Sequence, residues 1–383
     1  MNKVYISGIG QTPVQEKWDK SLKELAGDAG LLALNDAGIG YPDALFVGNM
    51  MSATANQQLQ LGALLADWLG FHHKPALHVE SACSSGSTAF RAALMAIASG
   101  EITSVLVIGV EKMTDSPSAE ITSSLATAAD ADLEWDMGVS FVALNALIMR
   151  RYMFEYGWKH EDFADFSLNA HANAVHNPYA RFQKAISRDA FLQAGMICDP
   201  INLMDASPVG DGAAAVVLTS RPTRSDRKHV YVAASSSMTD TISIQNRKSA
   251  SHLLAAEESA KKAFAQAGVQ PKDIGVFEYH DAFSIMAALS LEAAGFCEPG
   301  QAPHLAKEGK IRFDSDIPVA TMGGLKARGH PVGATGIYQI LEVTQQLWGL
   351  AGPTQVKRTK FGMTQNIGGS GSNITTHILK SEW

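Results

Sequence analysis

The stretch Glu80-Ser81-Ala82-Cys83-Ser84-Ser85-Gly86-Ser87 sets a reactive thiol among small residues at the start of a predicted helix. Apolar residues recur at helical spacing from Phe90 to Ile97, and Gly100 is typical of a helix end. The unpaired N–H groups and the dipole of a helix N-terminus favour negative charge. We therefore expect a lowered thiol pKa and a nucleophilic role for Cys83, although an isolated cysteine is more often a buried structural residue.

A second turn of the same kind, Gly329-His330-Pro331-Val332-Gly333-Ala334-Thr335-Gly336, carries a histidine. Apolar residues over 337–348 predict another amphipathic helix, and Pro331 fits its first position, where a missing N–H costs nothing. The surrounding glycines would allow a substrate to approach the backbone closely, which an ordinary core histidine does not require. His330 is therefore a candidate base for Cys83.

Length and composition are those of a globular enzyme. The 383 residues suffice for two domains and part of a third, and 46% hydrophobic with 18% charged residues is ordinary for a packed protein. The net charge of −7 disfavours nucleic acid as the main partner. The three cysteines, Cys83, Cys198 and Cys297, have no paired spacing, which fits a reducing compartment and excludes a CxxC zinc site. Residues 1–8 suggest a strand rather than a signal peptide, so we expect a cytoplasmic enzyme that binds no membrane.

The order of its motifs indicates an internal duplication of the chain. The first half predicts a helix ending at Gly38, a loop containing Asp43 and then a strand. The second half predicts the same order, with Gly268 and Asp273 each 230 positions further along. Each unit then continues to its reactive turn and the helix behind it. We therefore expect two related halves to deliver the cysteine and the histidine to one site.

Strands that alternate with helices predict an α/β fold of mostly parallel sheets covered by helices. Residues 104–109 and 213–218 are nearly all apolar, as expected of strands buried on both faces. Residues 112–205 do not recur in the second half, and a long excursion of this kind is usually functional, so we interpret them as a lid or binding subdomain. The expected domains are 1–111 with 206–221, an inserted domain over 112–205, and a second half over 226–383.

Five motifs in a fixed order give the chain a resemblance to the thiolase superfamily over essentially its whole length. The motifs are Ser81-Ala82-Cys83-Ser84-Ser85-Gly86, Gly109-Val110-Glu111-Lys112-Met113, residues 206–214, His280-Asp281-Ala282-Phe283 and residues 323–336. The His-Asp-x-Phe form of the fourth motif is similar to that of the sterol-carrier-protein and archaeal branch. The resemblance implies a thiolase fold, in which two duplicated βαβαβαββ-type halves stack as α/β/α/β/α layers and carry an inserted loop domain.

The resemblance also implies roles for individual residues. Cys83 would be the nucleophile that takes an acyl group from a thioester, and His330 would accept its proton. His280, with a bound water, would form one oxyanion hole and polarise the carbonyl of the attacking acyl-CoA. The N–H groups of Cys83 and Gly368 would form a second oxyanion hole over the acyl-cysteine intermediate.

Substrate and partner expectations follow from the same resemblance. Ser207 and Met137 match positions that flank the pantetheine arm of coenzyme A, and residues 112–205 match the loop domain that covers this ligand. We expect CoA and acyl-CoA thioesters as substrates, no permanently bound cofactor and no metal. A homodimer or homotetramer is implied, because the thiolase site lies close to a dimer interface.

The chain departs from the thiolase pattern at the second catalytic cysteine, which exchanges a proton with the carbon next to the thioester. That cysteine stands either in a Cys-x-Gly motif near the C-terminus or inside His-Asp-Cys-Phe, and the matching residues here are Asn366 and Ala282. Neither side chain exchanges a proton near neutral pH. Cys198 and Cys297 match no catalytic position. Acylation of Cys83 should survive this loss, whereas the group that replaces the acid/base cysteine stays open.

Three functions remain open from the sequence. The first is an acetyl-CoA acetyltransferase of lipid metabolism that forms or cleaves a 3-ketoacyl-CoA such as acetoacetyl-CoA. The second is a thiolase-like acyltransferase or retro-aldolase that depends on a small OB-fold/zinc-ribbon protein, because relatives in this branch often associate with one. The third is a non-catalytic scaffold, which the joint presence of Cys83, His280 and His330 argues against. A 3-ketoacyl-carrier-protein synthase is less favoured, since residues 326–331 resemble thiolases.

Overall fold

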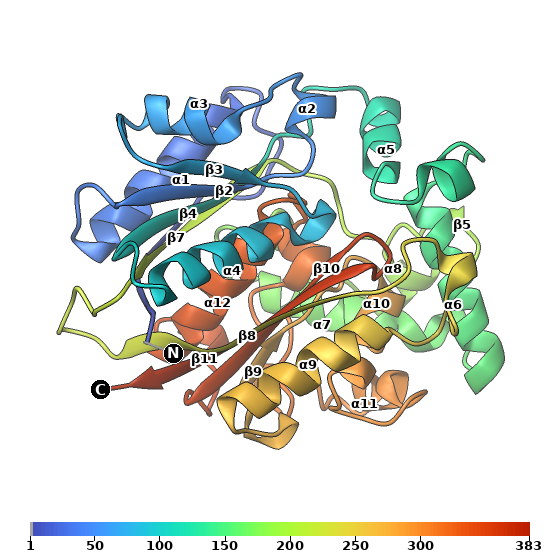
Figure 1. Cartoon of the computed structure of the whole chain (residues 1–383). Coiled ribbons are helices and arrows are strands. Elements are labelled where there is room, and N and C mark those ends of the chain that lie inside the picture. Colours follow the sequence, from blue (N-terminus) through green and yellow to red (C-terminus); the bar gives the residue numbers. More distant parts are fainter. Residues whose placement is uncertain (1–2) are drawn as a thin grey trace.

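The computed structural model describes residues 3–383, which form two halves joined along one nine-stranded sheet (Figure 1). In sheet order, the first half supplies β3 (Ala76–Val79), β2 (Ala44–Gly48), β4 (Ser104–Glu111), β7 (Gly212–Thr219) and β1 (Tyr5–Gln11). The second half continues with β8 (His229–Thr239), β11 (Asn373–Glu382), β10 (Phe361–Gly368) and β9 (Val276–Glu278). β1 and β8 join the halves through the antiparallel pairs Tyr5–Tyr231 and Ile6–Val230.

The two halves repeat one strand topology. In the first half, β2 pairs in parallel with β4, and β4, β7 and β1 follow as antiparallel neighbours. In the second half, β9 pairs in parallel with β10, and β10, β11 and β8 follow as antiparallel neighbours. A parallel bridge from Phe277 to Val319 stands where β3 pairs with β2 in the first half. This repeat confirms the duplication that the sequence indicates.

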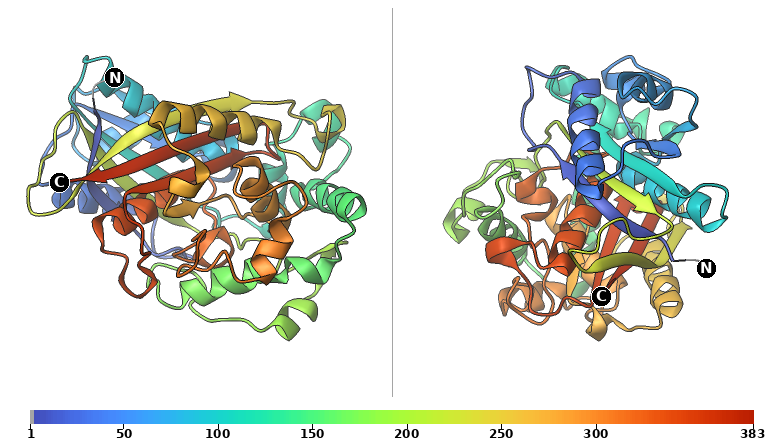
Figure 2. Two further views of the ribbon diagram at one scale, coloured as in Figure 1. Left: turned by 90° about the horizontal axis from the view of Figure 1, so that it is seen from below. Right: turned by 90° about the vertical axis from the view of Figure 1, so that its left-hand side faces the viewer.

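The strands of the first half and the strands of the second half lie on opposite sides of a central helix layer (Figures 1 and 2). The joined sheet therefore provides two strand layers, and the expected α/β/α/β/α arrangement is observed. The helices are, in layer order, α1 (Leu22–Ala37) and α3 (Leu61–Trp68), then α4 (Ser85–Ala98) and α12 (Thr335–Trp348), then α9 (Leu254–Ala267) and α10 (Ser284–Ala293). The central pair, α4 and α12, follows the two reactive turns. A Cβ on Gly86 would lie 2.6 Å from the carbonyl oxygen of Gly333, so the chain segments meet too closely there for a side chain.

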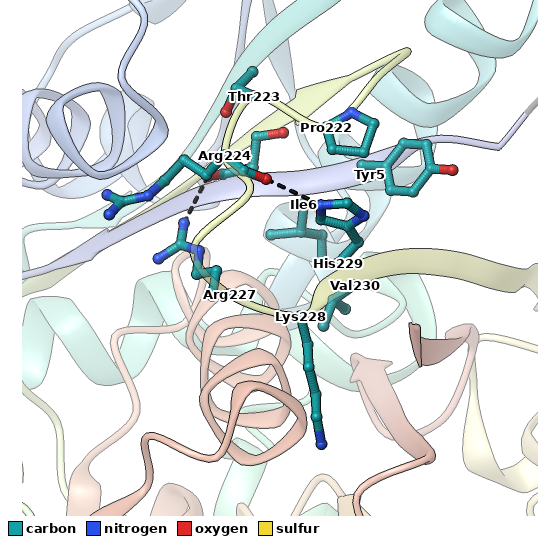
Figure 3. Close-up of a pocket in the computed structure, with 10 residues that line it drawn as sticks. Tyr5, Ile6, Pro222, Thr223, Arg224, Arg227, Lys228, His229 and Val230 are labelled. Carbon is teal, nitrogen blue, oxygen red and sulfur yellow. Dashed lines mark hydrogen bonds between the residues drawn. The ribbon is translucent and has the colours of Figure 1, made fainter. Parts of the chain in front are cut away.

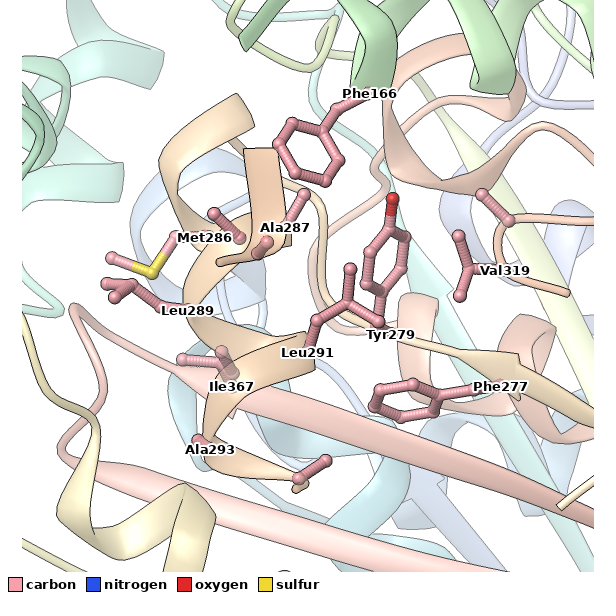
Figure 4. Close-up of a cluster of buried hydrophobic side chains, with 14 of the residues drawn as sticks. Phe166, Phe277, Tyr279, Met286, Ala287, Leu289, Leu291, Ala293, Val319 and Ile367 are labelled. Carbon is pink, nitrogen blue, oxygen red and sulfur yellow. The ribbon is translucent and has the colours of Figure 1, made fainter. Parts of the chain in front are cut away.

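Residues 112–205, coloured mainly green in Figure 1, share a core with the second half. They contain α5 (Ser118–Ala126), η2 (Ala131–Trp135), α6 (Phe141–Tyr156), η3 (His160–Phe163), α7 (Ala164–Ala174), α8 (Arg188–Leu192), β5 (Met196–Cys198) and β6 (Ile201–Asn202). Phe166 of α7 belongs to the same buried cluster as Phe277 and Tyr279 of the second half (Figure 4). Apolar packing, and not the loop ends alone, therefore holds this insert in place.

Short elements complete the fold and present the reactive turns. They are α2 (Ser52–Ala55), η1 (Ala82–Ser84), η4 (Ile244–Asn246), η5 (Pro271–Asp273), α11 (Ala302–Lys307), η6 (Gly324–Arg328) and η7 (Gly352–Thr354). η1 contains Cys83, and η6 ends two residues before His330. Within residues 3–383, no helix combines the length and the apolar composition that crossing a membrane requires.

Candidate active site

Cys83 lies in η1, the single turn that leads from β3 into α4. The turn is strained, because Ala82 adopts a left-handed backbone with a φ of 49°, which costs a non-glycine residue roughly 1–2 kcal/mol. Ser85 holds the turn by donating its hydroxyl to the Ala82 carbonyl at 2.6 Å and accepting the Ser81 N–H at 2.8 Å. Cys83 is thereby held at the start of α4, with 4% of its surface exposed.

The surroundings of Cys83 raise its thiol pKa to about 12, so the expectation of a lowered pKa is wrong. Burial of the sulfur is the largest cause, and the carboxyl group of Glu111 adds to it. The N–H groups of Cys83 and Gly369 bond to the sulfur and lower the pKa, but burial outweighs them. The resting side chain is a neutral thiol that needs a base before it can attack a thioester.

Two histidines face this thiol. The Sγ atom of Cys83 and one ring nitrogen each of His280 and His330 all lie within 4.8 Å of one another. The two rings stand edge to face, with centroids 5.2 Å apart and planes at 85°. Zinc also prefers cysteine and histidine ligands, and among residues 3–383 this is the one cluster with metal-ligand spacing. What the three groups do depends on where the histidine protons lie.

His330 is prepared to accept a proton at Nε2. Thr335 donates its hydroxyl to the Pro331 carbonyl at 3.1 Å, so its oxygen accepts the Nδ1–H of His330 at 2.7 Å. This bond places the ring proton on Nδ1 and leaves a lone pair on Nε2. Burial, followed by the neighbouring His280 and Arg328, holds the pKa of His330 well below its usual value, so the ring is neutral. The arrangement suits a general base that takes the thiol proton.

His280 is the opposite tautomer, with its ring proton on Nε2. The side-chain amide of Asn366 donates to His280 Nδ1 at 2.9 Å, which places the ring proton on Nε2. Burial, followed by the charge of Arg328, lowers the pKa of His280 to about 3, so this ring is also neutral. A buried Nε2–H group can donate to an oxygen that gains negative charge during a reaction. Asn366, at one of the two positions where the resemblance implies an acid/base cysteine, therefore orients His280 instead.

Glu111, at the end of β4, ties the two reactive turns together. Its buried carboxylate accepts the N–H groups of Met50 and Met51, both at 3.0 Å, and the side-chain amide of Asn49 at 2.7 Å. It also accepts the N–H of Gly333, in the histidine-bearing turn, at 2.8 Å. Burial raises the pKa of Glu111 to about 7 despite these four donors. In the sequence, Glu111 is part of a motif but is not singled out as a site residue. A carboxylate at the end of a strand that is otherwise apolar is the signal that could have identified it as a buried, hydrogen-bonded group.

A pocket of about 580 Å³ leads to Cys83 and His330 and is the candidate substrate site. Its volume lies within the usual range of ligand pockets, about 300–1,000 Å³. Most of its wall is apolar, with Phe141 and Phe283 among the larger side chains. Besides Cys83 and His330, its polar lining consists of Thr122, His171, Arg181, Lys184, Ser207 and Lys326.

The remaining predicted site residues, Ser207, Met137 and Gly368, lie at different distances from the reactive groups. Ser207 lines the pocket, whereas Met137 is not among the lining residues and is 72% exposed. Gly368 ends β10 against the cysteine turn, where a Cβ would lie 2.6 Å from the Ser81 carbonyl oxygen. The N–H of the next residue, Gly369, bonds to the sulfur of Cys83. Met137 therefore stands apart from the reactive groups in the isolated chain.

Figure 3 shows a smaller depression between β1 and the segment that links the two halves. Its volume is about 10 Å³, which is close to the space that one water molecule needs. Arg227 in this segment donates to the Ser7 carbonyl at 2.7 Å and pairs with Asp36 at 2.8 Å. The contacts anchor the linker to the first half, and the depression is too small for a substrate.

Known protein families account for almost the whole chain. The family profile of the thiolase N-terminal domain matches residues 4–222, and that of the thiolase C-terminal domain matches residues 236–381. The chain belongs to the thiolase family. The acetyl-CoA acetyltransferase of Methanothermobacter thermautotrophicus is 42% identical to this thiolase over 385 aligned positions, which cover 99% of this chain and all of the relative.

Two further proteins resemble this thiolase over nearly its full length. Sterol carrier protein 2 of Homo sapiens is 32% identical, and the alignment covers 98% of the thiolase and 72% of the relative. The solved structure of an Ltp2-ChsH2(DUF35) aldolase superimposes with a TM-score of 0.86 at 22% identity, covering 99% and 98% of the two chains. The thiolase fold and family expected from the motifs are confirmed. The protein is a thiolase-type acyltransferase.

Proposed function

We propose that this thiolase is an acetyl-CoA C-acetyltransferase, which condenses two acetyl-CoA molecules to acetoacetyl-CoA or cleaves acetoacetyl-CoA with CoA. The observation that carries the proposal is a buried neutral thiol, Cys83, beside two neutral histidines of opposite polarity. His330 accepts at Nε2 and His280 donates at Nε2, so one ring takes the thiol proton while the other stabilises an oxyanion. The 42% sequence identity to an acetyl-CoA acetyltransferase supports acetyl as the group transferred.

Acylation begins when Cys83 attacks the thioester carbonyl of acetyl-CoA and His330 takes the thiol proton. The carbon–sulfur bond to CoA then breaks, and the CoA thiolate receives that proton from His330. Because burial raises the pKa of the free thiol, Cys83 is neutral at rest and needs His330 to accept its proton as it attacks. The N–H groups of Cys83 and Gly368 would hold the tetrahedral oxygen, and loss of one such donor typically slows a reaction about 10²–10³-fold. His280, with a water, would polarise the carbonyl of the second acetyl-CoA.

The insert over residues 112–205 is proposed to cover the CoA moiety and to contribute to a dimer or tetramer. Ser207 lines the pocket and is placed to flank the pantetheine arm. Met137 is largely exposed in the single chain, so its proposed contact with CoA requires closure of the insert or a second subunit. The proposed domain limits are those expected from the sequence, with the halves on either side of this insert.

The first test is thiolysis of acetoacetyl-CoA by the purified chain, measured beside the variant Cys83→Ala. We expect turnover by the wild type and a loss of about 10⁴-fold or more in the variant, as for removal of other catalytic nucleophiles. Cys198→Ala is the matched control and should retain the wild-type rate. Mass spectrometry of acetyl-CoA-treated protein should find one acetyl group on Cys83. A wild-type chain that neither turns over nor becomes acetylated would contradict the proposal.

A partner-dependent acyltransferase or retro-aldolase is the second candidate. It is favoured by Ala282 and Asn366, which replace the two cysteines that serve as acid/base in other thiolases. The solved Ltp2-ChsH2(DUF35) aldolase has the same fold and combines two named components, which supports a partner such as a small OB-fold/zinc-ribbon protein for this chain. This reading predicts acetylation of Cys83 without thiolysis by the chain alone, and activity restored by a co-purified small protein.

A further inference from the structure

Carbon–carbon bond formation needs a group that removes a proton from the α-carbon of acetyl-CoA. Neither Ala282 nor Asn366 can do so, and Cys83 carries the acetyl group at this stage. Of the other polar residues that line the pocket, Arg181 stays charged at all accessible pH values. Lysine, in contrast, becomes a general base when its charged form is destabilised by burial.

Lys326 is a pocket-lining lysine that is itself buried, with 1% of its surface exposed. Its Nζ donates to the carbonyl oxygen of Asp205. That carbonyl also accepts the N–H of Ser284 at 3.0 Å, and Ser207 donates its N–H to the Ala282 carbonyl at 2.8 Å. Ala206 and Phe283, which follow Asp205 and Ala282 in the chain, form an antiparallel bridge. The amine of Lys326 is therefore hydrogen-bonded to the backbone next to this bridge.

Lys326 bonds to a backbone carbonyl and takes part in none of the ion pairs found within residues 3–383, and the Asp205 carboxylate pairs with His160 instead. Asp205 and Asp281 lie nearby and favour the charged form of Lys326. Burial outweighs both and lowers the pKa of Lys326 to about 8. By contrast, His171 directs its Nδ1 at the Lys184 carbonyl at 3.2 Å, and burial lowers its pKa. Burying an ammonium group without a carboxylate in an ion pair costs free energy, which favours the neutral amine at this pocket wall.

We propose that Lys326 exchanges the proton of the carbon–carbon step, an inference that rests on the proposed acetyltransferase function. The neutral amine takes the α-proton of acetyl-CoA and becomes an ammonium. The resulting enolate carbon attacks the acetyl carbonyl on Cys83, and the carbon–sulfur bond to Cys83 breaks. The Cys83 thiolate then receives the proton from Lys326. Acetoacetyl-CoA, a thiol and a neutral amine remain, so atoms and charges balance, and the reverse steps describe cleavage.

The test separates the two half-reactions in wild type, Lys326→Met and Lys326→Arg. Acetylation of Cys83 is followed by mass spectrometry, and α-proton exchange of acetyl-CoA in D₂O is followed by NMR. We expect both variants to acetylate Cys83 as the wild type does and to lose α-proton exchange and thiolysis by about 10²–10⁴-fold, the usual contribution of a general base. Arginine keeps the positive charge but cannot release a proton, so its failure would identify proton transfer as the role of Lys326. Lys262→Met, at an exposed lysine of α9, is the control substitution.

Each outcome decides between the two proposals. A wild type that does not acetylate Cys83 overturns the acetyltransferase proposal, whatever the Lys326 variants do. If the wild type is active, α-proton exchange at the wild-type rate in Lys326→Arg overturns the role of Lys326. An equal loss of acetylation and exchange shows a structural role only and also overturns it. If Lys326→Met does not fold, Lys326→Arg alone decides, because loss of exchange with normal acetylation supports the proposal and exchange at the wild-type rate overturns it.

Discussion

Two neutral imidazoles flank the sulfur of Cys83, and a hydroxyl and an amide decide what each ring can do. Thr335 accepts the Nδ1–H of His330, which leaves Nε2 of that ring free to accept a proton. Asn366 donates to Nδ1 of His280, which leaves Nε2–H of that ring free to donate. The two side chains in contact with the rings are therefore as important for the chemistry as the rings themselves.

Replacing Thr335 by valine keeps the shape of the side chain and removes the acceptor for the Nδ1–H of His330. Part of the enzyme should then carry its proton on Nε2, where it cannot accept from the thiol. We expect kcat for thiolysis to fall about 10²-fold with KM nearly unchanged, and Thr335→Ser to restore most of the rate. Steady-state kinetics of the two variants provide the check. A change in KM alone, or equal loss in both variants, would show that the contact serves packing.

The central helices α4 and α12 set the distance between the two reactive turns. A Cβ on Gly336 would lie 2.5 Å from the backbone nitrogen of Ser87 and 2.7 Å from the side-chain oxygen of Asn366. Contacts this short leave no room for a methyl group without moving one helix. The glycines therefore allow the two halves to bring the cysteine and the histidine together.

Gly336→Ala should destabilise the fold and displace the catalytic groups at once. We expect the free energy of unfolding to fall by about 1–3 kcal/mol, the usual cost of overpacking a core. Gly40→Ala is the matched control, because a Cβ there meets no atom within 4 Å, and its effect should stay within about 0.5 kcal/mol. Denaturant unfolding measures both variants. Equal stability of the two would show that α4 and α12 have room to separate.

Glu111 connects parts of the molecule that are remote in the chain. Its carboxylate accepts N–H groups from the first half and from Gly333 of the second half. Burial raises the pKa of Glu111 from the ordinary 4.5 to about 7. Between these pH values the folded protein holds a proton on Glu111 that the unfolded chain has already released. The contribution of Glu111 to stability is therefore complete below about pH 4.5 and is lost as the pH rises through 7.

Glu111→Gln resembles the protonated acid and should remove this dependence on pH. We expect the stability of the wild type, relative to the variant, to decrease between pH 5 and pH 8 and to level off above that range. Denaturant unfolding of both proteins at several pH values provides the comparison. A stability difference that stays constant over this range would show that Glu111 is already ionised at pH 5.

The sequence alone determined the family and the duplicated α/β architecture, and it singled out Cys83 and His330 as the candidate nucleophile and base. These features depend on local signals, such as the helix-ending glycines Gly38 and Gly268 and the small residues around Cys83 and His330. Such signals are read from a few neighbouring residues, because capping and turn formation act over short distances in the chain. The five thiolase motifs then identified the order in which the elements assemble.

Only the tertiary structure decided the protonation states and the burial on which the chemistry depends. From sequence, the helix N-terminus suggests an acidic thiol at Cys83, but burial and Glu111 raise its pKa instead. The contact of Asn366 with His280, the anchoring of Lys326 to Asp205 and the position of the pocket likewise join segments far apart in the chain. Desolvation depends on every atom that surrounds a group, and most of those atoms come from distant parts of the sequence.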